Sequence, residues 1–218
     1  MLLKDKIELP KYSLREEIIN SCSHGLGSIL SIIGLILLLI KTVGSHNTIG
    51  IVCCCIYALS LIVLYSCSCL YHGLKHNNGK RVLRIIDHCS IYLLIAGTYT
   101  PYTLLTLKGS LGLTLFIIVW SIAVLGIVLN AVDLKKFKLF SIISYISAGW
   151  VIIFALPPIK NALPKEGLIL LVIGGILYTI GGLIYALAKK YKYSHSIFHI
   201  FVLIASILHF LSIYFYVI

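Results

Sequence analysis

Seven stretches of about 20 mostly apolar residues follow one another along this chain of 218 residues and leave little room for other structure. They run over residues 24–42, 49–71, 85–106, 111–131, 139–157, 167–188 and 196–217. A helix of about 20 residues rises about 30 Å, which matches the hydrocarbon core of a bilayer. Only 11% of the residues are charged, too few to cover a water-soluble domain, in which roughly 25% are charged. The sequence therefore predicts an all-α integral membrane protein, a bundle of seven transmembrane helices.

The residues before the first apolar stretch are more polar. Residues 1–23 are expected to form a cytoplasmic or interfacial N-terminal segment, and residues 24–218 a single transmembrane domain. Within the first segment, residues 14–20 mix Leu and Ile with Arg, Glu and Asn. That mixture predicts a short amphipathic helix on the inner membrane surface.

Lysine and arginine are unevenly distributed between the two sides of this bundle. Fourteen of the 18 lie in the N-terminal segment and in the loops on its side. The other four are Lys41, Lys108, Lys160 and Lys165. Loops rich in these residues stay in the cytoplasm, so the N-terminus is predicted to be cytoplasmic and the C-terminus outside. The net charge of +11 resides in short clusters between apolar stretches, so we expect no nucleic-acid partner. We predict no obligate protein partner either.

Two features predict details of helix packing. Pro101 is expected to loosen one turn of the third span, because proline cannot complete the helical hydrogen-bond ladder. Small residues let membrane helices approach closely, and four glycines in the sixth span repeat at seven-residue spacing. These are Gly174, Gly175, Gly181 and Gly182.

A set of polar residues lies at one end of the predicted spans. Asp87 begins the third span, His72 ends the second with Ser68 four residues before it, and His195 and His199 begin the seventh. The i, i+4 spacing brings His195 and His199 to one helix face, with Cβ atoms about 6 Å apart. The orientation was derived from lysine and arginine alone, yet it brings all five residues to the cytoplasmic side.

Ionisable residues within spans are costly and therefore point to function. Three neutral imidazoles plus a water form the open arrangement of catalytic zinc, and a nearby carboxylate can take up the proton of that water. Histidines at span ends also lie at the interface without a ligand, so both interpretations stay open from the residues alone. His24 is a candidate to support the site. His209, about 15 Å beyond His199, cannot reach the same ion and is expected to line a cavity or pack.

At these residues the chain resembles the hemolysin III family, the bacterial branch of the progestin and adipoQ receptors, which are similar in turn to the alkaline ceramidases. The resemblance covers nearly the whole chain. Four ordered motifs carry it: residues 16–27, residues 68–72 (Ser-Cys-Leu-Tyr-His), residues 87–101, and residues 195–199 (His-Ser-Ile-Phe-His) with His209 and Phe210 downstream.

The resemblance implies a Zn²⁺ ion held by His72, His195 and His199. It also implies that Asp87 contacts the water on that ion and that Ser68 supports the site. The receptor members of the family are linked to ceramide hydrolysis. The bacterial members are named for red-cell lysis and are connected with membrane lipid homeostasis.

Three functional hypotheses follow. The leading one is a zinc-dependent hydrolase, located in a bacterial cell membrane, that cleaves a lipid amide or ester, with Asp87 and Ser68 as catalytic residues and a membrane lipid as substrate. The second is a cytolysin or pore, although the spans carry no polar stripe of the kind that a water-filled pore needs. The third is a non-catalytic membrane sensor in which the zinc is structural.

Overall fold

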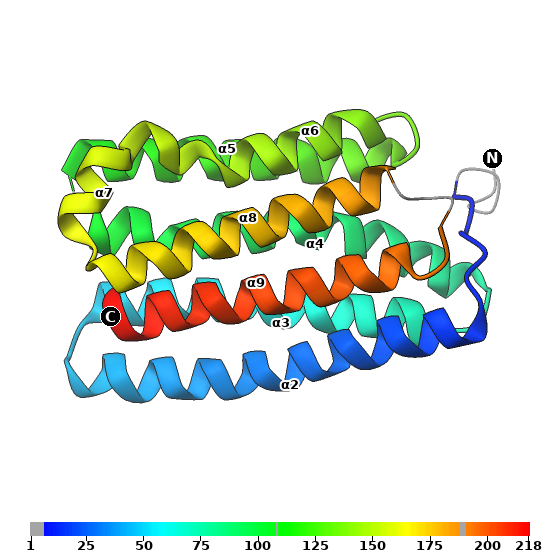
Figure 1. Cartoon of the computed structure of the whole chain (residues 1–218), viewed down its shortest axis with the longest axis horizontal. Coiled ribbons are helices and arrows are strands. Elements are labelled where there is room, and N and C mark those ends of the chain that lie inside the picture. The colour runs from blue at the N-terminus through cyan, green and yellow to red at the C-terminus, as the bar shows by residue number, and fades with distance from the viewer. Residues whose placement is uncertain (1–6, 108, 188–190) are drawn as a thin grey trace.

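The computed structural model of this chain describes residues 7–107, 109–187 and 191–218, in which there are helices but no strand. Within these residues, seven helical segments are long and apolar enough to cross a membrane, which confirms the predicted fold class (Figure 1). The helices are α2 (Leu14–Gly44), α3 (Thr48–Gly73), α4 (Asn78–Pro101), α5 (Gly109–Asp133), α6 (Lys138–Gly149), α7 (Leu156–Ala162), α8 (Lys165–Leu187) and α9 (Ser194–Tyr216). A π-helix, η1 (Tyr102–Thr106), continues α4, and a 3₁₀ segment, η2 (Val151–Ala155), joins α6 to α7.

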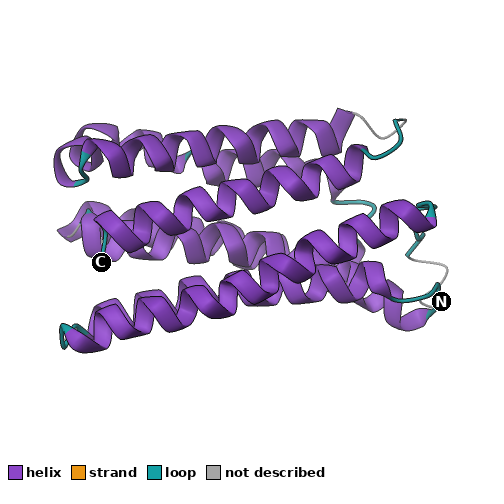
Figure 2. Cartoon of the chain, turned by 60° about the horizontal axis from the view of Figure 1, so that its bottom comes forward, coloured by secondary structure: helices purple, strands orange, loops and turns teal. Residues whose placement is uncertain are grey.

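The spans lie side by side along the long axis of the molecule, as both views show (Figures 1 and 2). Neighbours in sequence pack together, and α9 returns to contact both α8 and α2, so the spans close into a ring. The C-terminus lies at the end of the bundle opposite the start of α2 (Figure 1). Five lysines used to predict the orientation lie outside the described residues: Lys4, Lys6, Lys108, Lys189 and Lys190.

The first helix differs from the expectation of a separate surface helix over residues 14–20. Ser13 caps α2, accepting a hydrogen bond from the Glu16 backbone amide, while the Glu16 carboxylate accepts one from the Ser13 amide. This capping box starts a helix at Leu14, and no proline interrupts it before Gly44. Residues 14–20 are therefore the first two turns of the first span, which begins ten residues earlier than expected.

The expected disturbance at Pro101 is present. The helix widens directly after the proline into the five-residue π-helix η1. Side-chain hydroxyls satisfy carbonyl groups around it, since Thr100 donates to the Ala96 carbonyl at 2.8 Å and Thr103 to the Tyr99 carbonyl at 2.9 Å. In lipid, such internal partners are what make a helix irregularity tolerable.

Two of the four glycines that repeat at seven-residue spacing in α8 make close contacts with α9. A Cβ atom at Gly174 would lie 2.8 Å from His209 Nε2, and one at Gly181 would lie 3.0 Å from Phe201 Cβ. Gly175 and Gly182 make no such contact, so the predicted packing seam is confirmed for one glycine of each pair.

The closest glycine contact with a side-chain ring lies between α5 and α4 and gives a stability prediction. A Cβ atom at Gly126 would overlap the ring of Tyr92, whereas one at Gly182 would meet nothing within 4 Å. Overpacking costs about 1–3 kcal/mol, so Gly126→Ala should lower the unfolding temperature by about 3–10 °C. The matched control Gly182→Ala should leave it unchanged or raise it, because alanine favours a helix. Thermal unfolding in detergent measures both, and equal unfolding temperatures would contradict the observed helix packing.

Candidate metal centre

Three histidine rings meet at one end of the bundle, the end predicted to face the cytoplasm. His72 comes from the last turn of α3, and His195 and His199 come from the first turns of α9. Nε2 of His195 lies 3.2 Å from Nε2 of His72 and 3.0 Å from Nε2 of His199. Nitrogens about 2.0–2.1 Å from one tetrahedral ion would be about 3.3 Å apart. The three rings therefore fit a single metal ion, and the structure brings together the three residues that the sequence indicated.

A carboxylate from α2 sets the orientation of one ring. The Glu17 carboxylate accepts a hydrogen bond from His72 Nδ1 at 2.6 Å and lies 2.7 Å from Lys80 Nζ through its other oxygen. A proton on Nδ1 leaves the lone pair of His72 Nε2 free to face the ion. Lys80 is only 1% exposed, so its ammonium compensates the negative charge of Glu17 inside the protein.

Sequence reasoning missed both Glu17 and Lys80. Glu17 was assigned to the polar N-terminal segment and Lys80 to a cytoplasmic loop. The signal was a stripe along α2 in which Asn20, His24 and Gly27 are buried at three- and four-residue spacing. Continued one turn towards the N-terminus, that stripe reaches Glu17, which marks the start of the buried helix face.

The two other predicted residues lie on the wall of an adjoining cavity. Ser68 and Asp87 line the same cavity as His195 and His199. Asp87 lies next to Ser68 and close to His72. The structure thus gathers all five predicted residues at one end of the bundle, on α3, α4 and α9.

His24 supports the centre through ring stacking. Its ring lies 3.7 Å from the ring of His199, centroid to centroid, with an angle of 19° between the planes. His24 is 3% exposed, and neither of its ring nitrogens has a hydrogen-bond partner among the described residues. It therefore adds a fourth imidazole at the metal end of the cavity, positioned against a candidate ligand.

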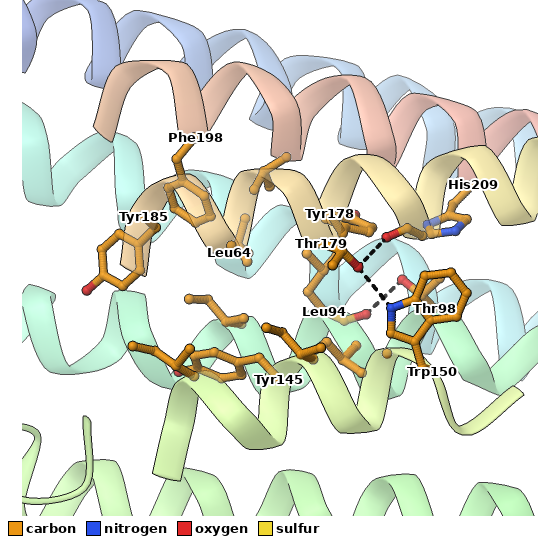
Figure 3. A pocket seen from close by; sticks show the side chains of 18 of the residues that line it. Leu64, Leu94, Thr98, Tyr145, Trp150, Tyr178, Thr179, Tyr185, Phe198 and His209 are labelled. Atoms are coloured by element: carbon orange, nitrogen blue, oxygen red, sulfur yellow. Dashed lines mark hydrogen bonds between the residues drawn. The ribbon is translucent and has the colours of Figure 1, made fainter. Parts of the chain in front are cut away.

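The cavity runs from the histidines into the middle of the bundle between α3, α4, α6, α8 and α9. In Figure 3, Tyr185 and Phe198 lie towards one end, and Trp150 and His209 lie towards the other. Trp150 donates a hydrogen bond to Thr179 at 2.9 Å, and His209 Nε2 lies 3.1 Å from the Leu171 carbonyl. The expectation that His209 lines a cavity is confirmed. The rest of the wall is largely apolar and suits a hydrocarbon chain.

The N-terminal segment closes the cytoplasmic side of the centre. The ring of Tyr12 stacks on His195 at 4.9 Å with an interplanar angle of 14°. Ile7 is buried, and its carbonyl accepts a hydrogen bond from Arg81 at 3.2 Å. Burial raises the pKa of the Tyr12 hydroxyl well above its usual range, so Tyr12 stays protonated and neutral beside the histidines.

The Glu17 contact predicts a change in metal affinity. Replacing a carboxylate that orients a metal-binding histidine costs about 10–100-fold in affinity, so Glu17→Gln should weaken Zn²⁺ binding by that factor. Competition with a chromophoric chelator measures it. Glu166→Gln is the matched control, because Glu166 is exposed in the first turn of α8, at the opposite end of the bundle, and should not change Zn²⁺ affinity.

Glu17→Gln also leaves Lys80 without its carboxylate partner. The double variant Glu17→Gln/Lys80→Met removes both charges of this pair, including the buried ammonium, and should regain stability while keeping the weaker zinc binding. Wild-type affinity in a folded Glu17→Gln protein would mean that Glu17 does not support the centre.

Comparisons with known proteins agree with this arrangement. A family model described as "Haemolysin-III related" matches residues 12–210. The hemolysin-3 homolog of Bacillus subtilis (strain 168) is 42% identical over 205 residues, which cover 94% of this chain and 96% of that protein. Hemolysin-3 of Bacillus cereus is 41% identical over 204 residues, covering 94% and 93%. The monocyte to macrophage differentiation factor of Homo sapiens is 25% identical over 168 residues, covering 74% and 68%.

These matches confirm the resemblance found in the four motifs. Together with the seven apolar spans, they identify a multi-pass protein of the bacterial cell membrane. The chain belongs to the haemolysin-III-related family.

Proposed function

We propose that this protein is a zinc-dependent hydrolase that cleaves an amide or ester bond of a membrane lipid and so contributes to lipid homeostasis. The observation that carries the proposal is the position of the three converging imidazoles at the end of an apolar cavity. A carboxylate, Asp87, lies on the wall of the same cavity. This combination offers a ligand set for a cation, a proton acceptor and space for a hydrocarbon chain.

The composition of the ligand set favours catalysis over a purely structural role. Structural zinc sites are closed by four protein ligands, whereas catalytic sites use three and keep one position open. His72, His195 and His199 supply three. A zinc ion held by them would make water more acidic and polarise an acyl carbonyl.

The remaining roles fall to residues of the cavity wall. Asp87 takes the proton of the attacking water and returns it to the leaving nitrogen or oxygen. Ser68 donates a hydrogen bond to the oxygen of the acyl group as negative charge develops there. The acyl carbon gains the water oxygen and loses its bond to the leaving group. The products are a fatty acid and an amine or alcohol.

The two alternatives have less support. The names of the Bacillus relatives favour a cytolysin, but a largely apolar cavity cannot hold the water column of an ion-conducting pore. A structural ion in a sensor is consistent with Tyr12 covering the centre. It would, however, give no role to Asp87 and Ser68 on the cavity wall.

Two substitutions separate catalysis from metal retention. In purified protein supplied with ceramide-like amides and with ester lipids, Asp87→Asn should keep the bound metal but lower fatty-acid release by at least about 100-fold, because the proton acceptor is lost. His195→Ala should lose both metal and turnover. His76→Ala, in an exposed loop, is the control and should behave like wild type.

Mass spectrometry of the lipid products and metal analysis of the protein give the two readouts. Full turnover in His195→Ala would overturn the hydrolase. Metal binding with no lipid product in the wild type would favour the sensor. Conductance in liposomes that survives His195→Ala would favour the pore.

A further inference from the structure

A second cleft lies at the cytoplasmic end of the bundle, beside the metal centre. Its walls carry four basic residues: Arg84 and His88 of α4, Lys135 of the loop between α5 and α6, and Lys138 of α6. Among the described residues, Glu8 is the one acidic residue in the wall. Three permanently cationic side chains therefore face one carboxylate, which makes the cleft attractive to anions.

The cleft and the apolar cavity lie on either side of a shared set of residues. His88, Ile142, Tyr145 and Tyr185 line both spaces. Tyr185 also lies close to the metal centre, with its ring 5.8 Å from the ring of His195. In Figure 3, Tyr185 lies at the end of the cavity away from His209. An amphiphile whose apolar part fills the cavity near the histidines would therefore need to extend only past this shared wall to reach the basic cleft.

The tendency of basic residues to lie on the cytoplasmic side does not by itself explain the positive charges of the cleft. Lysines that only need to keep a loop in the cytoplasm can be fully exposed, as Lys75 is. Arg84 and Lys138 are instead partly buried, which costs solvation of their charges. Lys135 pairs with Glu8 at 3.0 Å. The three ion pairs within the described residues do not include Arg84, whose charge acts on Asp87 and Tyr185 nearby.

We propose that this cleft binds the anionic, phosphate-bearing headgroup of the membrane lipid whose acyl chain enters the apolar cavity. The proposal rests on the proposed hydrolase function and narrows its substrate class from any lipid amide or ester to anionic lipids. The cleft lies at the cytoplasmic ends of the spans, the depth of lipid headgroups, where basic pockets between helices recognise such groups. Its shared wall with a hydrocarbon-binding cavity identifies the source of the phosphate as a lipid, since a free phosphate would not need that cavity.

Ligand binding to the full chain tests this assignment without relying on turnover. Trp150 lines the apolar cavity, so its fluorescence reports the arrival of an acyl chain. In neutral detergent at low salt, lysophosphatidylglycerol should bind about tenfold more tightly than lysophosphatidylcholine of the same chain length. Arg84→Gln/Lys138→Gln should abolish this preference without weakening lysophosphatidylcholine binding. Lys75→Gln, which removes an exposed cation from the same side, should keep it.

Three outcomes would overturn the headgroup site. They are equal affinity for the two lipids in wild type, an unchanged preference in the double variant, and a preference lost equally in Lys75→Gln. Soluble glycerol phosphate, which has no acyl chain, tests whether the cleft binds a free phosphate rather than a lipid headgroup. If glycerol phosphate bound as tightly as lysophosphatidylglycerol, the assignment of the cleft to a lipid headgroup would be rejected.

A variant of the metal site distinguishes a failure of the headgroup proposal from a failure of the hydrolase proposal. The preference should persist in His199→Ala, because the cleft does not include His199. If wild type hydrolyses lipids but shows no headgroup preference, the hydrolase stands and the headgroup site fails. If the preference is present but no lipid is cleaved, the headgroup site stands and the hydrolase fails.

Discussion

The hydrogen bond between the Glu17 carboxylate and His72 Nδ1 is the interaction on which the geometry of the centre depends. It joins α2 to α3 and fixes which nitrogen of His72 faces the two histidines of α9. Lys80 compensates the carboxylate at 2.7 Å, so the group can lie inside the protein without an unpaired charge. Few water molecules can replace such partners in a bilayer, and polar groups of separate helices are therefore satisfied by one another.

Much of this arrangement could be predicted from the sequence, because length and hydropathy determine how spans cross a bilayer. The seven spans, and the common depth of Ser68, His72, Asp87, His195 and His199, followed from counting apolar and basic residues. Those counts contain no information on helix rotation. Glu17 and Lys80 were missed for that reason, since both sit in sequence that looks polar and exposed. Contacts between α2, α3 and α4 bury Lys80 and partly bury Glu17.

The positions of the apolar cavity and the basic cleft follow from the way in which the spans pack. The ring of spans closes where α9 meets α2, and the interior left between α3, α4, α6, α8 and α9 is the apolar cavity. The early start of α2 brings the N-terminal segment over the cytoplasmic end, where Tyr12 covers His195. The basic cleft beside Arg84 and Lys138 lies at the same end. An amphiphile with one hydrocarbon chain and an anionic head matches the apolar cavity and the basic cleft beside it.

X-ray absorption spectroscopy of the zinc-loaded protein tests the central claim most directly, because it reports the ligands of the metal and their distances. The account predicts one ion per chain with three histidine nitrogens at about 2.0–2.1 Å, one exchangeable oxygen ligand and no sulfur. It also predicts that the spectrum of this site disappears in a folded His199→Ala protein. Sulfur ligands from any of the seven free cysteines, or a site that persists in His199→Ala, would contradict a centre shared by α3 and α9.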